Sequence, residues 1–228
     1  MAKTKKQEED VKMENVQEAL SKSEAFIEKY RRQLLIGIGI VVAIVLAIIL
    51  FRTYYLVPKS EEAQDAMLPA VAAFESDQYE LALRGDEQND GFEAIVDEYG
   101  MTDAAELAAY YAGVCAYNLG EYEEAASYLK KVDNRSVNLA PAAKMLLGDC
   151  HVQLDEYEKA VKCFEKAAER ENMLIAPKAL KKAGLAYEKM GKYAKAAKAY
   201  TKIKDTYFQS QEAADIEKYI DRANALAK

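Results

Sequence analysis

Few residues in this chain have the types and spacing that catalysis or metal binding requires. His151 is the single histidine among 228 residues, and no serine or cysteine has an evident general base at hand. The cysteines, Cys115, Cys150 and Cys163, are odd in number and show neither a CxxC pair nor a Cys/His ligand spacing. We therefore predict that the protein is not an enzyme, uses no cofactor and binds no metal, with His151 and the cysteines packed in helices.

The charge of the chain is acidic overall and unevenly distributed. The formal net charge is -7, yet residues 1–51 carry eight basic and seven acidic residues, so the excess acid belongs to the remainder. An acidic domain repels a polyanion, which disfavours nucleic acid as a partner. The composition therefore favours protein partners.

Residues 33–51, QLLIGIGIVVAIVLAIILF, form an uncharged apolar stretch near the start of the chain. As a helix this stretch is about 28 Å long, which matches the hydrocarbon core of a bilayer. A buried core helix would normally keep a polar stripe, and this stretch has none. The pattern predicts a single transmembrane signal anchor, since the residues that follow it contain no small-residue cleavage site.

The basic residues around this stretch predict its orientation. Four precede it closely and two follow it: Lys22, Lys29, Arg31 and Arg32 against Arg52 and Lys59. This bias favours a cytoplasmic tail over residues 1–32 and sends the C-terminal domain across the membrane. Within the tail, a weak amphipathic pattern from Val11 fits either a helix on a membrane or partner surface, or an extension of the anchor helix.

An internal repeat dominates the rest of the chain. Its three copies read LGEYEEAASYLKKV, LDEYEKAVKCFEKA and MGKYAKAAKAYTKI. Gly113, Gly148 and Gly184 occupy one position of the repeat, and periods of 35 and 36 residues separate them. We expect this glycine to let one helix approach its partner closely. Seven residues later, Gly120, Asp155 and Gly191 occupy a turn position that favours a left-handed residue.

This pattern resembles the tetratricopeptide repeat over residues 105–204. The resemblance is strong in the second half of each repeat. It departs at the first aromatic position, where this chain has Ala109, Lys144 and Leu180. Pro141 and Pro177 suit the first turn of a helix, where no amide donor is needed.

The flanking segments extend the predicted helical stack. We expect residues 52–104 to hold a linker and degenerate repeat helices, with one helix starting at a Ser60 cap and a hairpin at residues 77–83 interrupted by a polar loop. Residues 205–228 should supply a C-terminal capping helix, which an open solenoid needs. The predicted fold class is all-α: one N-terminal transmembrane helix followed by a tetratricopeptide-repeat α-solenoid.

The resemblance implies a protein-binding groove on the inner face of the first helix of each repeat. The positions carried over are Leu107, Tyr110, Val114, Tyr117, Asn118, Met145, Asp149, Val152, Lys178, Lys181, Leu185 and Lys189. Tyrosine and methionine offer adaptable apolar contact, while the pattern that clamps a C-terminal carboxylate in some relatives is missing. The alternative is that several of these residues pack between helices.

Two segments of opposite charge suggest a second candidate binding surface. Fourteen acids and one base, Arg84, lie between Glu61 and Glu106, whereas nine lysines and one acid lie between Lys178 and Lys204. The basic segment fits either a patch for an acidic partner or an ordinary solvated helix face.

The order of tail, anchor and repeat domain resembles the YfgM-type ancillary subunits of the bacterial SecYEG translocon. That resemblance implies an inner-membrane protein with a periplasmic domain. It also implies partners: the translocon, a PpiD-type periplasmic chaperone and newly translocated client chains. Two alternatives remain: a scaffold for envelope assembly or cell division, and a cytoplasm-facing membrane adaptor.

Overall fold

The computed structural model describes residues 29–227, apart from 34, 134–135, 138 and 170–171. The amphipathic pattern expected in the tail lies outside the described residues. The chain divides into two units, residues 1–55 and residues 56–228, and each is described by itself.

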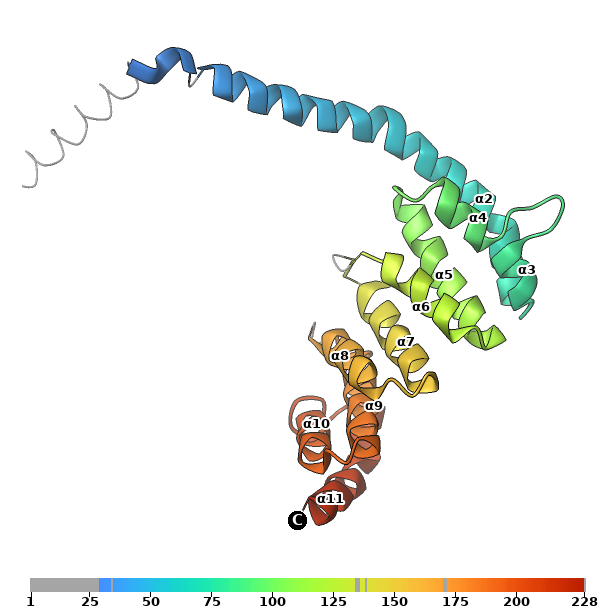
Figure 1. Ribbon diagram of the computed structural model, residues 1–228, viewed down its shortest axis with the longest axis vertical. Helices are drawn as coiled ribbons and strands as arrows, with labels where there is room; N and C mark the ends of the chain where they lie inside the picture. The colour runs from blue at the N-terminus through green and yellow to red at the C-terminus, as the bar shows by residue number, and fades with distance from the viewer. Residues whose placement is uncertain (1–28, 34, 134–135, 138, 170–171, 228) are drawn as a thin grey trace, which may run out of the picture. The chain divides into compact units, whose positions relative to one another are not determined.

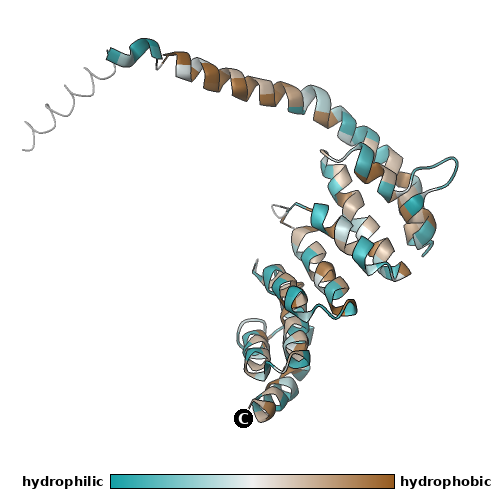
Figure 2. Ribbon diagram, viewed as in Figure 1, coloured by the Kyte–Doolittle hydropathy of each residue, from teal (hydrophilic) through white to brown (hydrophobic). Residues whose placement is uncertain are grey.

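The first unit contains the apolar helix. Among the described residues, one helical run, Lys29–Glu75, includes a stretch long and apolar enough to cross a membrane, and none of that stretch is buried. Figure 2 shows the brown, hydrophobic colour of this stretch. A π-helical turn, η1 (Arg52–Leu56), follows it, and the Phe51 and Tyr55 rings stack with centroids 5.1 Å apart.

The second unit begins with a helix that starts earlier than expected. Helix α2 runs over Val57–Glu75 and follows η1 without a break, so the predicted start at a Ser60 cap is wrong. The physical reason is that the amide groups at Ser60 already have helical partners in the preceding turn, and no cap is needed. Proline near the start of α2 is compatible with this arrangement because its fixed φ is helical.

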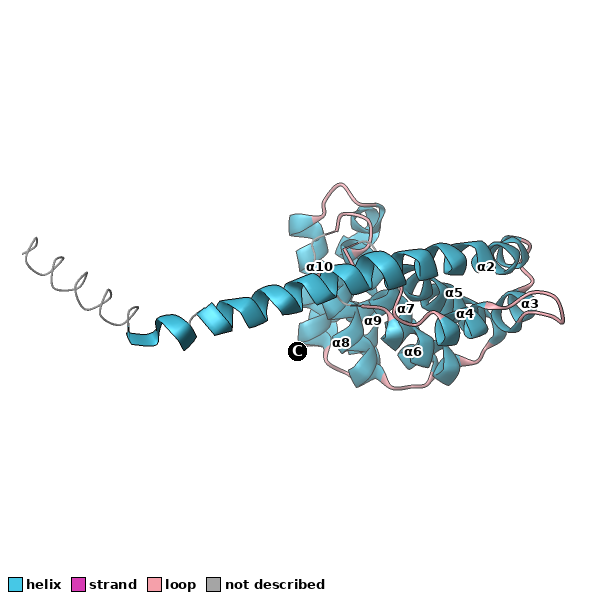
Figure 3. Cartoon of the chain, turned by 90° about the horizontal axis from the view of Figure 1, so that it is seen from above, coloured by secondary structure: helices cyan, strands magenta, loops and turns pink. Residues whose placement is uncertain are grey.

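Three helix pairs follow in the repeat region, and loops and turns connect the helices (Figures 1 and 3). The pairs are α5 (Asp103–Leu119) with α6 (Tyr122–Lys131), α7 (Leu139–Gln153) with α8 (Tyr157–Ala168), and α9 (Ala176–Lys189) with α10 (Tyr193–Thr206). The described residues hold no strand, only an isolated bridge between Gly85 and Asp90. The all-α solenoid expected from the sequence is confirmed.

The repeat glycines lie where one helix of a pair touches the other. A Cβ atom added at Gly113 would lie 2.6 Å from Leu129 Cγ, and one added at Gly148 would overlap the Phe164 ring. At Gly184 the overlap would be with the ring of Tyr200, sixteen residues later in the chain, as in the other two pairs. The close approach expected from the repeat pattern is confirmed.

The turns inside the pairs have the left-handed backbone that the pattern predicts. Gly120 has φ 83°, Gly191 has φ 70°, and Asp155 has φ 56°. Aspartate tolerates this conformation because its short polar side chain bonds locally. Here the Tyr157 hydroxyl donates to Asp155 Oδ1 at 2.7 Å.

A degenerate repeat precedes the three clear ones. Asp77 also has a positive φ, 58°, and accepts a 2.7 Å hydrogen bond from the Tyr79 hydroxyl, which repeats the Asp155 turn. Helix α3 (Tyr79–Arg84) and helix α4 (Phe92–Glu98) then stand where a single second helix would, separated by a polar loop. Figure 3 shows this loop in pink beside α3.

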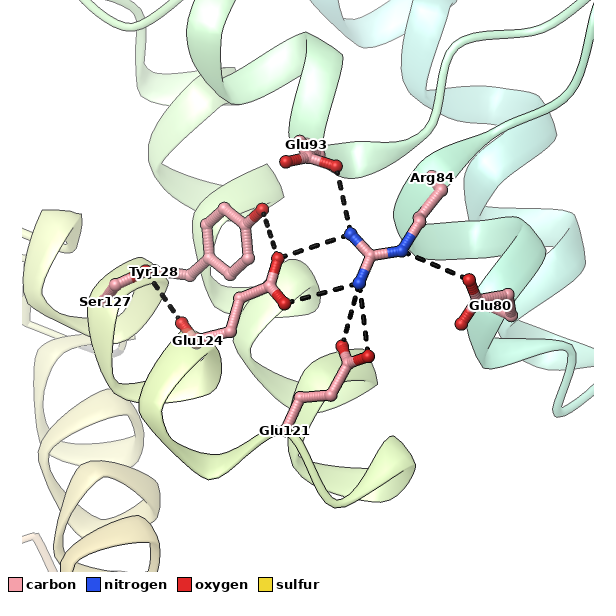
Figure 4. A network of polar contacts seen from close by, with 7 residues as sticks. All are labelled: Glu80, Arg84, Glu93, Glu121, Glu124, Ser127 and Tyr128. Atoms are coloured by element: carbon pink, nitrogen blue, oxygen red, sulfur yellow. Dashed lines mark hydrogen bonds and ion pairs between the residues drawn. The ribbon is translucent and has the colours of Figure 1, made fainter.

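Arg84 ties these degenerate helices to the first clear repeat (Figure 4). Its guanidinium donates to Glu121 at 3.0 Å, to Glu80 at 3.1 Å, and to Glu93 and Glu124 at 3.3 Å each. The hydrogen bond from Arg84 is the main reason that the pKa of Glu124 lies below its usual value. One base therefore holds four acids from helices α3, α4 and α6 and the turn before α6.

The core is divided into two clusters of buried side chains. One covers buried residues from Ala63 to Cys150, and the other covers buried residues from Ala160 to Ala223. Their most buried large side chains include Phe92, Leu129 and Tyr200. Each repeat is thus packed chiefly by its neighbours, as in other solenoids.

The C-terminal segment packs on the last repeat. A 3-10 turn, η2 (Gln211–Asp215), leads into α11 (Ile216–Leu226), which packs on α10. Ile216 is 1% exposed and Ala223 is fully buried, while most other positions of α11 are exposed or half-buried. The helix therefore closes the core with one apolar face.

Candidate protein-binding groove

The twelve predicted groove residues lie on the first helices of the repeats, α5, α7 and α9, and none is buried. This exposure leaves all of them accessible to a ligand in part or in full. Several also pack between helices, which agrees with the alternative interpretation of these positions. Tyr110 and Tyr117 pack against the first core cluster, and Met145 and Val152 pack against the second.

A cavity of about 650 Å3 brings four of the predicted residues together: Asp149, Val152, Leu185 and Lys189. The sequence did not indicate the rest of its wall. Those additional residues come from α8, α9, α10 and α11, and they are Tyr157, Phe164, Lys182, Ala186, Glu188, Tyr193, Arg222 and Leu226. Most of the wall is apolar, and Leu185 is 41% exposed within it.

The terminal helix was expected only to cap the solenoid, yet it also contributes to this wall. Arg222 and Leu226 of α11 line the cavity opposite α7 and α9. Their distance in sequence from the repeat motif explains why the repeat pattern missed them. An indirect signal was available, because a capping helix stacks at the place where a further first helix would lie.

Two ion pairs neutralise most of the charge in the cavity. Lys182 Nζ lies 2.5 Å from Asp149 Oδ2, and Arg222 Nη2 lies 2.6 Å from Glu188 Oε2. Burial raises the pKa of Asp149, and the lysine opposes that rise by favouring the carboxylate. Among the described residues, Lys189 is the cavity's one cation without an ion pair. The groove is therefore apolar with a single uncompensated positive charge.

A neighbouring cavity of about 390 Å3 shares Lys182 and Leu185 with the first and adds Lys178 and Lys181. Lys181 is already engaged, because its Nζ lies 2.8 Å from Asp215 Oδ1 and 4.7 Å from the centroid of the Tyr219 ring. It therefore holds the cap in place and is less available to a ligand than its neighbour Lys178, which is exposed.

Five of the predicted groove residues lie on α5. Leu107, Tyr110, Val114, Tyr117 and Asn118 line neither of the two cavities. Tyr117 contacts the next repeat through its hydroxyl, which accepts a 3.4 Å hydrogen bond from Gln153. The groove role of the α5 residues stays a prediction.

The basic segment is partly neutralised within the domain. Lys181, Lys182, Lys192 and Lys204 pair with Asp215, Asp149, Glu158 and Glu217. Five exposed lysines of this segment make no ion pair within the described residues: Lys178, Lys189, Lys195, Lys198 and Lys202. These five lie on two helices, so the remaining positive charge is spread over α9 and α10.

The histidine and two of the cysteines, residue types that can take part in catalysis or metal binding, are buried in the core. His151 is 7% exposed, and its Nδ1 lies 2.7 Å from Glu156 Oε2, which joins the end of α7 to the start of α8. Burial raises the pKa of Cys115 and of Cys150 to about 12, which keeps both as unreactive thiols. The described residues contain no group of three potential metal ligands.

Comparison with known proteins agrees with this architecture. Residues 145–210 match the tetratricopeptide repeat family, and residues 93–167 match the family described as anaphase-promoting complex, cyclosome, subunit 3. No curated protein matches the chain. Together with the helix pairs, the matches identify a tetratricopeptide-repeat protein, a class of scaffold for protein–protein interaction.

Two solved structures of MamA are similar to this chain in fold. The first has a TM-score of 0.54 and 19% identity, and the similarity covers 73% of this chain and 88% of that one. The second has a TM-score of 0.51 and 19% identity, covering 69% of this chain and 94% of that one. At this identity the similarity concerns the fold alone.

Proposed function

We propose that the chain is a non-enzymatic membrane-anchored scaffold that binds an apolar protein segment in the groove between α7, α9 and α11. The observation that carries this proposal is the 650 Å3 cavity, whose wall is mostly apolar and whose acids are paired internally. Lys189 adds an unpaired positive charge that would favour an acidic residue next to the apolar segment.

The finer proposal is that the anchor lies in the bacterial inner membrane with the tail in the cytoplasm and the repeats in the periplasm. The apolar helix and the basic residues before it support this orientation. In this setting the protein serves as an ancillary subunit of the Sec translocon. It links translocated chains to a PpiD-type chaperone, as the resemblance in architecture suggests.

The groove is tested by site-specific photo-crosslinking from Leu185 in cells that make the full chain. A matched probe at Lys162, an exposed residue of α8 outside both cavities, is the control. We expect partners to be captured from Leu185 and lost when Val152→Glu places a charge on the apolar wall. Equal capture from both probes would contradict a groove-specific partner.

The identity of the captured proteins decides between the biological settings. Translocon subunits or periplasmic chaperones would support the secretion role. A complex for envelope assembly or cell division would support the alternative scaffold. Cytoplasmic proteins alone would favour a cytoplasm-facing adaptor.

Orientation is tested separately by reporters fused after Lys228. Alkaline phosphatase folds productively in the periplasm because it needs disulfides, so we expect an active phosphatase fusion. A green fluorescent reporter exported through the Sec pathway should stay dark. The reverse pattern would contradict the proposed periplasmic domain.

A further inference from the structure

One edge of the repeat unit carries a row of exposed apolar side chains. Met101, Val137, Met173 and Phe208 follow one another at intervals of 36, 36 and 35 residues. Each stands in a connection between the second helix of one repeat and the next element, and their exposed fractions are 71%, 68%, 54% and 68%. Leu174, beside Met173, is 75% exposed. We call these five residues the apolar edge.

Exposed apolar side chains are not found equally in every loop of the repeat unit. In the described part of the second unit, seven large apolar side chains are more than half exposed, and five of them form the apolar edge. The turns within the repeats lie on the opposite edge. There the most exposed large apolar residue is Leu119, at 36%. Single exposed apolar residues are ordinary, but a row with the period of the fold indicates a contact surface.

The helix that follows the anchor in the chain, α2, starts at this edge of the repeat unit. Figure 1 shows the connections α4–α5, α6–α7 and α8–α9 on one side of the second unit. Helix α2 starts on that same side, because Lys59 Nζ in its first turn lies 5.1 Å from the centroid of the Tyr99 ring in the α4–α5 connection. Five residues, 52–56, separate Phe51 from Val57. Even if fully extended, the six Cα-to-Cα steps of this connection span no more than about 22 Å.

From these observations, and on the basis of the proposed membrane anchoring, we propose that the apolar edge rests on the membrane surface. Its side chains would enter the interfacial layer of the leaflet from which the anchor emerges. Tyr54 and Tyr55, which are 78% and 50% exposed, suit the same layer. The repeat unit would then be held by the anchor and by the edge together, with the groove fixed in orientation toward its partners.

The charges beside the edge predict which lipids it prefers. Asp97, Asp103 and Asp133 lie around the Met101 connection, where Lys131 pairs with Asp97 and Lys59 lies over the Tyr99 ring. Anionic lipid would repel these carboxylates, so the contact depends on apolar insertion and not on basic residues. We therefore expect the strongest contact on zwitterionic vesicles and a weaker contact as anionic lipid is added.

The sequence offers a clean probe, because the chain contains no tryptophan. The full chain is reconstituted into phosphatidylcholine vesicles with or without brominated acyl chains, which quench tryptophan at the membrane. Met101→Trp and Phe208→Trp test the first and last positions of the edge. Leu119→Trp on the opposite edge is the matched control, and Val42→Trp in the apolar helix reports anchoring.

We expect brominated lipid to quench Val42→Trp, Met101→Trp and Phe208→Trp and to leave Leu119→Trp unchanged. If Val42→Trp alone is quenched, the anchor inserts but the edge does not, and the inference fails while the proposed anchoring stands. If Val42→Trp is also unquenched, both fail. Quenching of Met101→Trp without quenching of Phe208→Trp would contradict membrane contact along the whole apolar edge, because only one loop would then lie near the membrane.

A protein partner on this edge is the other outcome. In that case the edge tryptophans would be unquenched in pure lipid vesicles and become protected in native membranes. That result would overturn the lipid contact and assign the edge to a protein.

Discussion

At the scale of single residues, the repeat glycines control how closely the two helices of a pair approach. Gly148 illustrates the constraint, because the ring of the fully packed Phe164 occupies the space that any Cβ would need. The left-handed glycine Gly120 has a different role, since the space beside it is open and its φ of 83° is the constraint.

Gly148→Ala should therefore destabilise the domain through overpacking, by about 1–3 kcal/mol. The measurement is urea unfolding of the full chain in detergent, with circular dichroism as the signal that monitors unfolding. Phe164→Leu alone should destabilise by loss of apolar burial. In the double variant we expect a smaller loss than the sum, because the shorter side chain makes room for the methyl group. Strict additivity would contradict the proposed contact.

Arg84 is the second residue whose role can be isolated. Arg84→Gln should lower stability at pH 7 by about 1 kcal/mol, a modest effect because the network is partly exposed. Glu124 has a lowered pKa, so its contribution is present above its unfolded pKa and is lost as pH falls through its folded pKa. The difference between wild type and variant should therefore shrink below about pH 4.5.

The control for this prediction is Lys131→Gln, which removes a more exposed ion pair with Asp97 and a contact with the Tyr128 ring. We expect a change within about 0.5 kcal/mol. A gap between wild type and Arg84→Gln that stays constant from pH 7 to low pH would contradict the electrostatic account.

At the scale of elements, α11 both closes the core and lines the groove. Ile216 is nearly fully buried against the last repeat, whereas Asp221 points to solvent on the same helix. Ile216→Ala should cost about 2–5 kcal/mol, and Asp221→Ala should change stability by less than about 0.5 kcal/mol. Urea unfolding measures both, and similar losses would show that α11 does not seal the core.

The turn that precedes α11 makes the cap sensitive to acid. Asp215 has its pKa lowered to about 2, chiefly by the hydrogen bond from Lys181 and then by Lys218. Its stabilising effect is present above its unfolded pKa and is lost as pH falls toward about 2. Asp215→Asn should loosen the cap at neutral pH and remove this acid dependence, as tyrosine fluorescence from Tyr219 and its neighbours would report.

At the scale of the whole molecule, the two core clusters predict that stability is not uniform along the repeat unit. Ile216→Ala should raise amide hydrogen exchange most in α9 to α11 and least in α2 to α6, because each repeat is supported mainly by its neighbours. Exchange measured by mass spectrometry tests this. An equal rise in every helix would indicate one cooperative unit.

The sequence by itself determined the repeat architecture. The period of the glycines, the turn residues and the tyrosines was enough to predict three helix pairs, their left-handed turns and their close approach. Local rules suffice for these features because each depends on steric limits within a few residues or between the helices of one pair. The apolar stretch at residues 33–51 was equally plain, since its length and composition are read directly.

Tertiary structure decided the features that depend on distant residues. It extended α2 to Val57, placed Arg84 among four acids, and engaged Lys181 with Asp215 in the cap. It also brought α11 to the groove beside α7 and α9. These outcomes depend on how the repeats stack on one another. The free energy of stacking depends on the surfaces of two neighbouring repeats, so the motif of a single repeat does not determine it.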